Sequence, residues 1–390
     1  MTTSLRVLFV IEALGEGGTE MSLAELLPGL RDGCVVPIVV CLKSRGEEGV
    51  EHSLVRAGFD IRFLRPGSML SQVRQLRAII KAERPDLVHT MLWRANQIGR
   101  LANLRRHPLL TSLVNESYGR TRLADPHVRR TTLRLLQVVD VVTSHGLTNA
   151  FHAVSESVKA AEVGDLRVSP ARITVVPRGR DDRRLGGPST ERRVAARREL
   201  GLADDRLVLV NVARQEYQKG HRHLLAALPA VLATHPNAIL LVAGRSGTET
   251  ADLERLARDT GVQDCVRFLG HVPGVADFLT AGDVFVFPSL YEGMPGAVIE
   301  AMAMGLPVVA SDIPPIREVV EPTKNALLVD PQDHRALADA IGALLDDPER
   351  RRAFGHESRR IYETRFGLDQ SVRGMLALYL QLTRGTSPAG

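Results

Sequence analysis

Two glutamates, Glu292 and Glu300, lie eight residues apart around a glycine-rich turn. Gly293, Pro295 and Gly296 stand between them, and an apolar helical pattern follows. Proline suits the first position of a helix, so a helix is predicted to begin at Pro295. The unpaired N–H groups at its start form an anion site, and the two carboxylates accept hydrogen bonds from hydroxyl groups. A phosphate beside sugar hydroxyls, as in a sugar nucleotide, suits this arrangement.

A plainer interpretation of the same segment is an amphipathic helix with solvated glutamates. It accounts for the apolar positions Ala297, Val298, Ala301 and Met302. It does not account for the glycine-rich turn, or for the buried strand predicted at 306–310 directly afterwards. On spacing alone, both interpretations stay open.

The segment 285–312, FVFPSLYEGMPGAVIEAMAMGLPVVASD, resembles the Glu-x7-Glu signature of glycosyltransferase family 4, and weaker resemblance covers nearly the whole chain. Members of that family are retaining glycosyltransferases of GT-B fold. The resemblance therefore implies an enzyme of carbohydrate biosynthesis that moves a sugar from a nucleotide-sugar donor to a hydroxyl-type acceptor. Acceptors in the family range from lipids and polysaccharides to small metabolites, so the acceptor is unknown.

Two cations follow the strand predicted at 207–212. Arg214 and Lys219 are five residues apart across a loop, so they can converge on one anion, the arginine as a bidentate fork and the lysine as a compact charge. Solvated surface charge is the alternative. The resemblance implies that this pair neutralises a leaving diphosphate, that Glu292 holds sugar hydroxyls and that Glu300 holds the ribose. Arg214, Lys219 and Glu292 are therefore the predicted catalytic residues.

Glycine-rich loops supply the other predicted donor contacts. The turn at 15–20 follows the first predicted strand and precedes a helix, so its N–H groups can face a phosphate. Glu20 stands where the dinucleotide fingerprint needs Gly or Ala, which disfavours a nicotinamide dehydrogenase; a plain strand-to-helix turn is the alternative. By resemblance, the predicted donor-binding residues are Gly17, Gly18, Gly244, His271, Gly293, Met294, Pro295, Gly296 and Glu300.

The predicted acceptor side departs from the resembled family. Its candidate residues are Glu20, His89 and Asn115. Many family members carry a histidine at the end of the fifth strand, where this chain has Val114, Asn115 and Glu116. Asn115 can form hydrogen bonds there but cannot do acid–base work. A lone histidine such as His89 is more often structural than catalytic.

No metal site and no cofactor are predicted, because the sequence contains no Asp-x-Asp motif that could hold a metal-bridged diphosphate. Arg214, Lys219 and the helix N-terminus would supply the counter-charge. Two other functions stay open. A sugar-nucleotide 2-epimerase of GT-B fold would need no acceptor, and a non-catalytic sugar-nucleotide-binding protein would explain the missing histidine. The Glu-x7-Glu spacing favours transfer, and the intact Arg, Lys and Glu positions argue against a decayed site.

The chain has a net charge of +5, and the stretch 94–134 holds nine arginines against two acidic residues. Aromatic residues make up only 4% and no basic run is interleaved with them, so no nucleic-acid partner is predicted. Docking to anionic lipid, a solvated helix face and a pocket for an anionic acceptor all stay open for this stretch. Three cysteines without metal or redox spacing, and no bilayer-length apolar run, predict a cytoplasmic protein, peripheral to the inner face of the membrane in the lipid-docking case.

Short apolar runs alternate with helical patterns throughout, which predicts an α/β protein of two doubly wound Rossmann-like domains facing a cleft. The acceptor-side domain is predicted at 1–180 and the nucleotide-sugar-binding domain at 181–367, joined by a charged, Gly- and Pro-rich linker at 178–190. By resemblance, the last helix within 368–390 crosses back to the first domain. Thirteen strands are predicted, at 6–11, 35–41, 61–64, 87–90, 109–114, 151–154, 173–176, 207–212, 239–243, 266–269, 284–287, 308–310 and 326–329.

Overall fold

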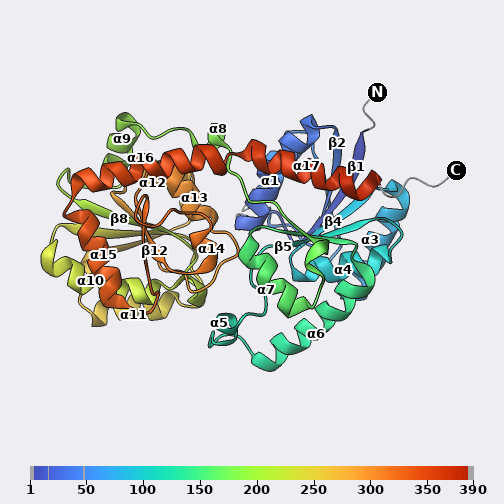
Figure 1. Cartoon of the computed structure of the whole chain (residues 1–390), viewed down its shortest axis with the longest axis horizontal. Coiled ribbons are helices and arrows are strands. Elements are labelled where there is room, and N and C mark those ends of the chain that lie inside the picture. Colours follow the sequence, from blue (N-terminus) through green and yellow to red (C-terminus); the bar gives the residue numbers. More distant parts are fainter. Residues whose placement is uncertain (1–3, 16, 47–48, 385–390) are drawn as a thin grey trace. The chain divides into compact units, whose positions relative to one another are not determined.

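The computed structural model describes residues 4–15, 17–46 and 49–384, which form two compact units (Figure 1). The first unit contains Met1–Gly119, Arg129–Gly179 and Leu368–Gly390, and the second contains Arg120–Val128 and Arg180–Gly367. The prediction divided the chain after residue 180. The contacts divide it after Gly179 and, unlike the prediction, group Arg120–Val128 with the second unit.

Seven parallel strands form the sheet of the first unit, in the order β3-β2-β1-β4-β5-β6-β7. The strands are β1 (Leu5–Ile11), β2 (Val35–Cys41), β3 (Asp60–Phe63), β4 (Leu87–Met91), β5 (Leu109–Leu113), β6 (Ala150–Ala153) and β7 (Ile173–Val175). The helices of this unit are α1 (Gly18–Asp32), α2 (Glu51–Arg56), α3 (Met69–Glu83), α4 (Trp93–Asn103), α6 (Arg130–Leu147), α7 (Glu156–Leu166) and α17 (Leu368–Arg384).

Alternate residues of β1 enter two different cores, because successive side chains of a strand point to opposite faces. Val7 and Phe9 pack with residues of α1 and α17, and Leu8 and Val10 pack with residues of α3 and α4. All four side chains are fully buried, and each such burial contributes about 1.5–3 kcal/mol to stability. Helices therefore cover both faces, as a parallel sheet requires.

Six parallel strands form the sheet of the second unit, in the order β10-β9-β8-β11-β12-β13. The strands are β8 (Leu207–Val212), β9 (Ala238–Ala243), β10 (Val266–Gly270), β11 (Val284–Phe287), β12 (Val308–Ser311) and β13 (Ala326–Val329). The helices of this unit are α5 (Arg120–Leu123), α8 (Asp182–Leu185), α9 (Thr190–Glu199), α10 (His221–Thr234), α11 (Thr250–Asp259), α12 (Val275–Thr280), α13 (Gly296–Ala303), α14 (Pro314–Arg317), α15 (His334–Leu345) and α16 (Pro348–Arg365).

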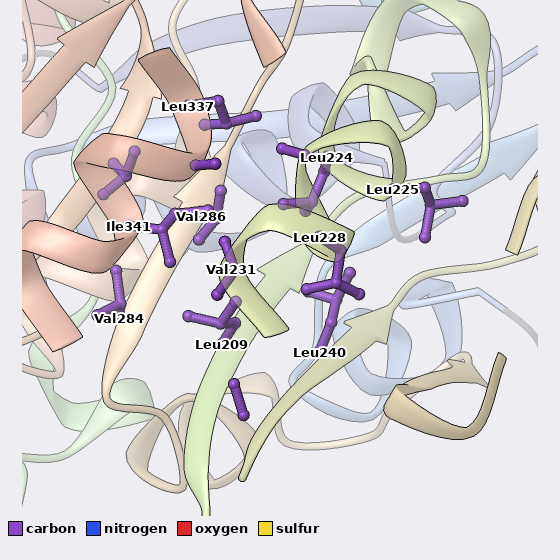
Figure 2. Packing of buried hydrophobic residues seen from close by; sticks show 14 of the residues in the cluster. Leu209, Leu224, Leu225, Leu228, Val231, Leu240, Val284, Val286, Leu337 and Ile341 are labelled. Carbon is purple, nitrogen blue, oxygen red and sulfur yellow. The ribbon is translucent and has the colours of Figure 1, made fainter. Parts of the chain in front are cut away.

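The core on one face of the second sheet is built by α10 and α15. Figure 2 shows Leu228 and Val231 of α10 and Ile341 of α15 gathered around Leu209 of β8 and Val286 of β11. These five side chains are at most 1% exposed. The core holds β8 and β11 side by side, and these are the strands whose ends carry the predicted catalytic loops.

The predicted α/β class and the two doubly wound parallel sheets are confirmed. All thirteen predicted strands are present, and every strand boundary lies within one residue of its prediction. Within the predicted linker 178–190, Arg180 is only 2% exposed, and its backbone N–H donates to the carbonyl of Phe366 at 2.9 Å. Within the described residues, no helix is both long and apolar enough to cross a membrane.

Candidate functional site

The strand order reverses between β8 and β11, and in open parallel sheets ligands bind at such a switch point, outside the carboxyl ends of the strands. The loops that follow β8 and β11 contact each other there. Gly220 has φ +64, and a Cβ at this position would lie 2.0 Å from the carbonyl oxygen of Pro288, so only glycine allows this approach. The N–H of Leu290 donates to the carbonyl of Gln218 at 2.8 Å. Lys219, between Gln218 and Gly220, is thereby fixed against the second loop.

Lys219 and Glu292 form the central ion pair of this site, with Nζ 2.5 Å from Oε1. The hydroxyl of Ser289 donates to the same carboxylate oxygen at 2.8 Å. The Lys219 ammonium also lies 5.6 Å from the ring centroid of Phe287. Its side chain is 16% exposed and that of Glu292 is 8% exposed. Both residues were predicted as catalytic, and the structure brings them into direct contact.

Arg214, the other predicted catalytic cation, lies at the end of β8 and is exposed. Among the described residues, no side-chain hydrogen bond or ion pair involves its guanidinium. A charged arginine in this state can bind an anion without first giving up a protein partner.

Glu300 lies on α13, which begins one residue later than predicted, since Pro295 is the N-cap rather than the first helical residue. Two arginines hold its carboxylate: Arg180 through Nε at 2.8 Å and Arg184 through Nη2 at 3.4 Å. The Arg180 guanidinium also lies at the start of α13, because a Cβ added to Gly296 would be 1.8 Å from its Nη2. A positive helix terminus and a buried guanidinium therefore share this corner of the site.

Neither arginine was predicted, because both fall in the segment interpreted as a linker. Nothing in the run RGRDDRR distinguishes a buried arginine from a solvated one. A carboxylate offers about four acceptor positions, so Glu300 can hold two arginines and still accept a bond from a ligand hydroxyl.

The remaining residues predicted on this sheet lie in adjoining strand-end loops. Gly293 and Met294 form the buried turn before α13. Gly244 follows β9 and donates its N–H to the carbonyl of Gly270 at 2.7 Å, which joins its loop to the end of β10. His271, next in the chain, is exposed. Since β10, β9 and β8 are neighbours, these loops open along the same edge as Lys219.

The segment Arg120–Val128, here called the arm, is part of the second unit, whereas the prediction from sequence assigned it to the first domain. Its His127 Nε2 lies 2.9 Å from Oε1 of Glu249, and the other oxygen of this carboxylate, Oε2, accepts from Arg222 Nε at 3.0 Å. Arg122 and Asp125 of the arm lie close enough to Tyr291 to act on its ionisation, although burial is the main cause that raises the pKa of this tyrosine to about 12. The arm therefore lies beside Tyr291, the residue directly before Glu292.

Gly17, Gly18 and Glu20 meet at the start of α1 in the first unit. Gly17 is the N-cap, and the carboxylate of Glu20 folds back against it. A carboxylate in the first turn stabilises the helix dipole. Arg178 donates from Nη2 to the hydroxyl of Thr19 at 3.1 Å, which places a guanidinium at the same terminus. The turn therefore presents backbone N–H groups together with a cation.

His89 is fully enclosed in the first unit and belongs to a buried hydrogen-bonded chain. Its Nδ1 lies 2.9 Å from Tyr379 Oη and its Nε2 lies 2.7 Å from Ser112 Oγ. Ser112 Oγ lies 2.9 Å from His152 Nδ1, and His152 Nε2 lies 2.9 Å from the carbonyl of Val176. A carbonyl only accepts, so His152 Nε2 donates and its Nδ1 accepts from Ser112. It follows that His89 Nε2 donates to Ser112 and that the Tyr379 hydroxyl donates to His89 Nδ1.

This chain engages both nitrogens of His89, and burial lowers its pKa well below the usual value. The ring borders a cavity of about 40 Å³ that is also lined by Met91, Val114 and Val154, at the ends of β4, β5 and β6. His89 therefore shapes the cavity wall, but it has no free nitrogen for an acceptor hydroxyl. Asn115, the other predicted acceptor-side residue, is half-buried after β5 and accepts from the N–H of Glu116 at 3.0 Å.

We expect His221, next to the site, to make folding stability sensitive to acid. Its Nε2 lies 2.9 Å from Asn211 Oδ1, and burial, followed by the charge of Lys219, lowers its pKa to about 4. The unfolded value is about 6.5, so the unfolded chain binds the proton more readily and this stability is lost as pH falls from about 6.5 to about 4. At about pH 5 the loss is about 2 kcal/mol.

Urea unfolding at about pH 7 and about pH 5 checks this expectation. The free energy of unfolding of His221→Gln should change less over this interval than that of the unsubstituted protein, by about 2 kcal/mol. Glu162 changes the free energy of unfolding in the opposite direction over this interval, because burial raises its pKa to about 8. This contribution is the same in both proteins, so it cancels in the comparison. An identical pH dependence in both proteins would contradict the prediction.

The chain is similar in sequence to known glycosyltransferases. A family model described as Glycosyl transferases group 1 matches residues 193–361, and one described as Glycosyltransferase Family 4 matches residues 16–184. The D-inositol 3-phosphate glycosyltransferase of Xylanimonas cellulosilytica is 34% identical over 313 residues, which cover 77% of this chain and 72% of the relative.

Two solved structures share the fold along almost the whole chain. Anabaena HepE, solved in complex with UDP and glucose, superposes with a TM-score of 0.83 at 22% identity, covering 97% of this chain and 99% of that one. Sucrose-phosphate synthase from Thermosynechococcus elongatus superposes with a TM-score of 0.84 at 23% identity, covering 98% and 100%. Identities this low indicate a common architecture.

Proposed function

This chain belongs to the family-4, group-1 glycosyltransferases and is a glycosyltransferase of GT-B type. From that premise we propose that it transfers a sugar from a nucleotide-sugar donor to a hydroxyl acceptor. We propose that the transfer retains the anomeric configuration and needs no metal ion. The contact between Lys219 and Glu292 carries the proposal. It joins a cation and a carboxylate at the switch point of the sheet, where a ligand is expected.

In the proposed reaction, the bond between the anomeric carbon and the donor phosphate oxygen breaks while a bond to the acceptor oxygen forms on the same face. The acceptor proton passes to the leaving phosphate oxygen, so no protein base is required. Lys219 and Arg214 stabilise the charge that develops on the diphosphate, which is often the largest electrostatic contribution to catalysis. Glu292 holds sugar hydroxyls, and Glu300 holds the ribose while Arg180 keeps its carboxylate in place.

The proposal also assigns residues to the donor phosphates and to the acceptor. The N-terminus of α13, with Gly293, Met294 and Gly296, would face the donor phosphates. The turn at Gly17 and Gly18 would face the diphosphate from the first unit. The acceptor is expected on the first unit, near Glu20 and the cavity bordered by His89.

Thermal unfolding in the presence of UDP-, GDP-, ADP- and dTDP-sugars, without metal, tests donor binding. A ligand that binds only the folded state stabilises it by about 2.7 kcal/mol at a hundredfold excess over its dissociation constant. One nucleotide sugar is expected to raise the unfolding temperature, and Glu300→Gln to reduce that rise. Lack of response to every sugar, with and without magnesium, would contradict the proposed donor site.

Product analysis with the responding donor then separates transfer from the other activities. A transferase forms a new glycoside only when an acceptor is present. A 2-epimerase would convert the donor sugar without any acceptor, and a non-catalytic binding protein would give no product with any acceptor. Either of these results would overturn the proposed transfer.

A further inference from the structure

Helix α6 exposes a stripe of apolar side chains that the proposed transfer reaction does not use. It lies at the periphery of the first unit (Figure 1), where it packs against α4 and α7. Residues spaced three, four and seven apart share one face of a helix. The stripe consists of Leu135, Val138, Val139 and Val142, which are 64%, 59%, 37% and 66% exposed. Scattered exposed apolar residues are ordinary, but a continuous stripe of this kind marks an interaction surface.

Buried polar contacts on the opposite face fix how α6 is turned. Asp140 is 6% exposed and forms an ion pair with Arg100, which is fully buried. Tyr118 donates its hydroxyl to Asp140 Oδ2 at 2.8 Å, and Gln97 Nε2 donates to Oδ1 at 3.0 Å. Rotating the stripe inward would leave these buried charges unpaired, at a cost of several kcal/mol. The exposed stripe is therefore a fixed feature of the folded unit.

The surroundings of the stripe are basic. Arg129, Arg130 and Arg134 are exposed at the start of α6, with Asp165 near Arg134. Near the end of α6, Arg172 lies 3.5 Å from the carbonyl of Ser144 and close to the exposed Arg105. Throughout its described length, α6 has no exposed carboxylate, because its single acidic residue is the buried Asp140.

We propose that the apolar stripe of α6, flanked at the start of the helix by Arg129, Arg130 and Arg134, docks on an anionic lipid bilayer. The apolar side chains would enter the boundary between headgroups and acyl chains while the arginines meet lipid phosphates. A second copy of the chain fits the face less well. Pairing two α6 helices in either direction brings basic ends together and offers no exposed α6 carboxylate to neutralise them. The lipid surface supplies the complementary charge.

Co-sedimentation of the full chain with sucrose-loaded vesicles tests the proposal. Vesicles of phosphatidylcholine containing phosphatidylglycerol should bind the protein, and vesicles of phosphatidylcholine alone should bind it much less. Leu135→Ser/Val138→Ser/Val142→Ser should lower the partition coefficient about tenfold or more, since binding scales with the apolar area buried. Arg129→Gln/Arg130→Gln should lower it about fivefold per arginine, and added salt should do the same.

Matched variants control for general effects of the substitutions. Leu70 on α3 and Val194 on α9 are 59% and 61% exposed, so Leu70→Ser/Val194→Ser changes exposed apolar residues outside α6. Arg258→Gln/Arg335→Gln likewise changes exposed arginines of α11 and α15. Both control variants should bind vesicles as the unsubstituted protein does, and the thermal unfolding of every variant should show that it is folded.

Three results would overturn the proposal. The first is failure of the folded protein to bind anionic vesicles, and the second is equal binding by the stripe variant and its control. The third is a dimer in light scattering that the stripe substitutions convert to a monomer, which would make a second copy the occupant. Vesicle binding is measured without any sugar donor, so its failure is distinguishable from failure of the proposed transfer reaction.

Discussion

Replacing Lys219 with alanine is expected to lower kcat for sugar transfer by about 10²- to 10³-fold, the loss typical when one preorganised charge-stabilising group is removed. The ammonium is fixed by Glu292 at 2.5 Å and remains partly exposed, so it can meet the leaving diphosphate without rearrangement. Initial-rate measurements with saturating donor and acceptor check the prediction. A folded Lys219→Ala enzyme with near-normal turnover would refute the assigned role.

Two further variants separate the lysine's charge from its structural contact. Ser289→Ala removes the hydroxyl bound to the same Glu292 oxygen but leaves the cation, so its kcat should fall less than about tenfold, as expected for one lost neutral hydrogen bond. Lys324→Ala removes an exposed lysine that pairs with Glu321 at 2.9 Å, and its kcat should not change. The Lys219→Ala substitution also leaves Glu292 buried without its cationic partner, which should lower the free energy of unfolding. Urea unfolding measures this loss of stability separately from the loss of kcat.

The substitution Gly296→Ala is expected to lower the free energy of unfolding by about 3–5 kcal/mol, the usual loss when a buried ion pair is broken. A Cβ at this position would lie 1.8 Å from Nη2 of Arg180, and that side chain is only 2% exposed, so it has little room to move. Its displacement would leave Glu300 with Arg184 alone, at 3.4 Å. Urea unfolding measures the loss, and the stabilisation by nucleotide sugar should fall with it.

Gly342→Ala on α15 is the matched control, because the nearest atom to its added Cβ is 3.9 Å away. It should leave stability unchanged or raise it by up to about 1 kcal/mol, the ordinary gain from alanine in a helix. A double-mutant cycle with Arg180→Ala sharpens the test. Both substitutions break the same Arg180–Glu300 contact, so the double variant should lose much less than the sum of the two single losses. A fully additive result would show that the contact is not the cause.

The sequence sufficed for the architecture because strands buried on both faces appear as short apolar runs with clear ends. β2, β8, β11 and β13 have the predicted bounds. Lys219 and Glu292 each follow a predicted strand, and ligands of such sheets bind outside the carboxyl ends of the strands. The family resemblance gave these residues their predicted roles, which remain predictions until the variants above are measured.

Contacts between distant segments could not be read from local pattern. Arg180 looks like one charged residue among several in a polar run, and only the fold shows that it is buried against Glu300, 120 residues away. The same holds for His89, whose hydrogen bond to Tyr379 spans 290 residues. The arm looked like part of the first domain because its neighbours on both sides belong there, whereas His127 contacts Glu249 of the second unit.

The chain passes between its two units four times, after Gly119, Val128, Gly179 and Gly367, and this affects how hybrids of related enzymes can be made. A single crossover near residue 180, which sequence suggests as the natural joint, would take the arm from one parent and its Glu249 contact from the other. It would also separate Tyr379 of α17 from His89, the residue to which its hydroxyl donates. An exchange of one whole unit between relatives therefore needs all four junctions.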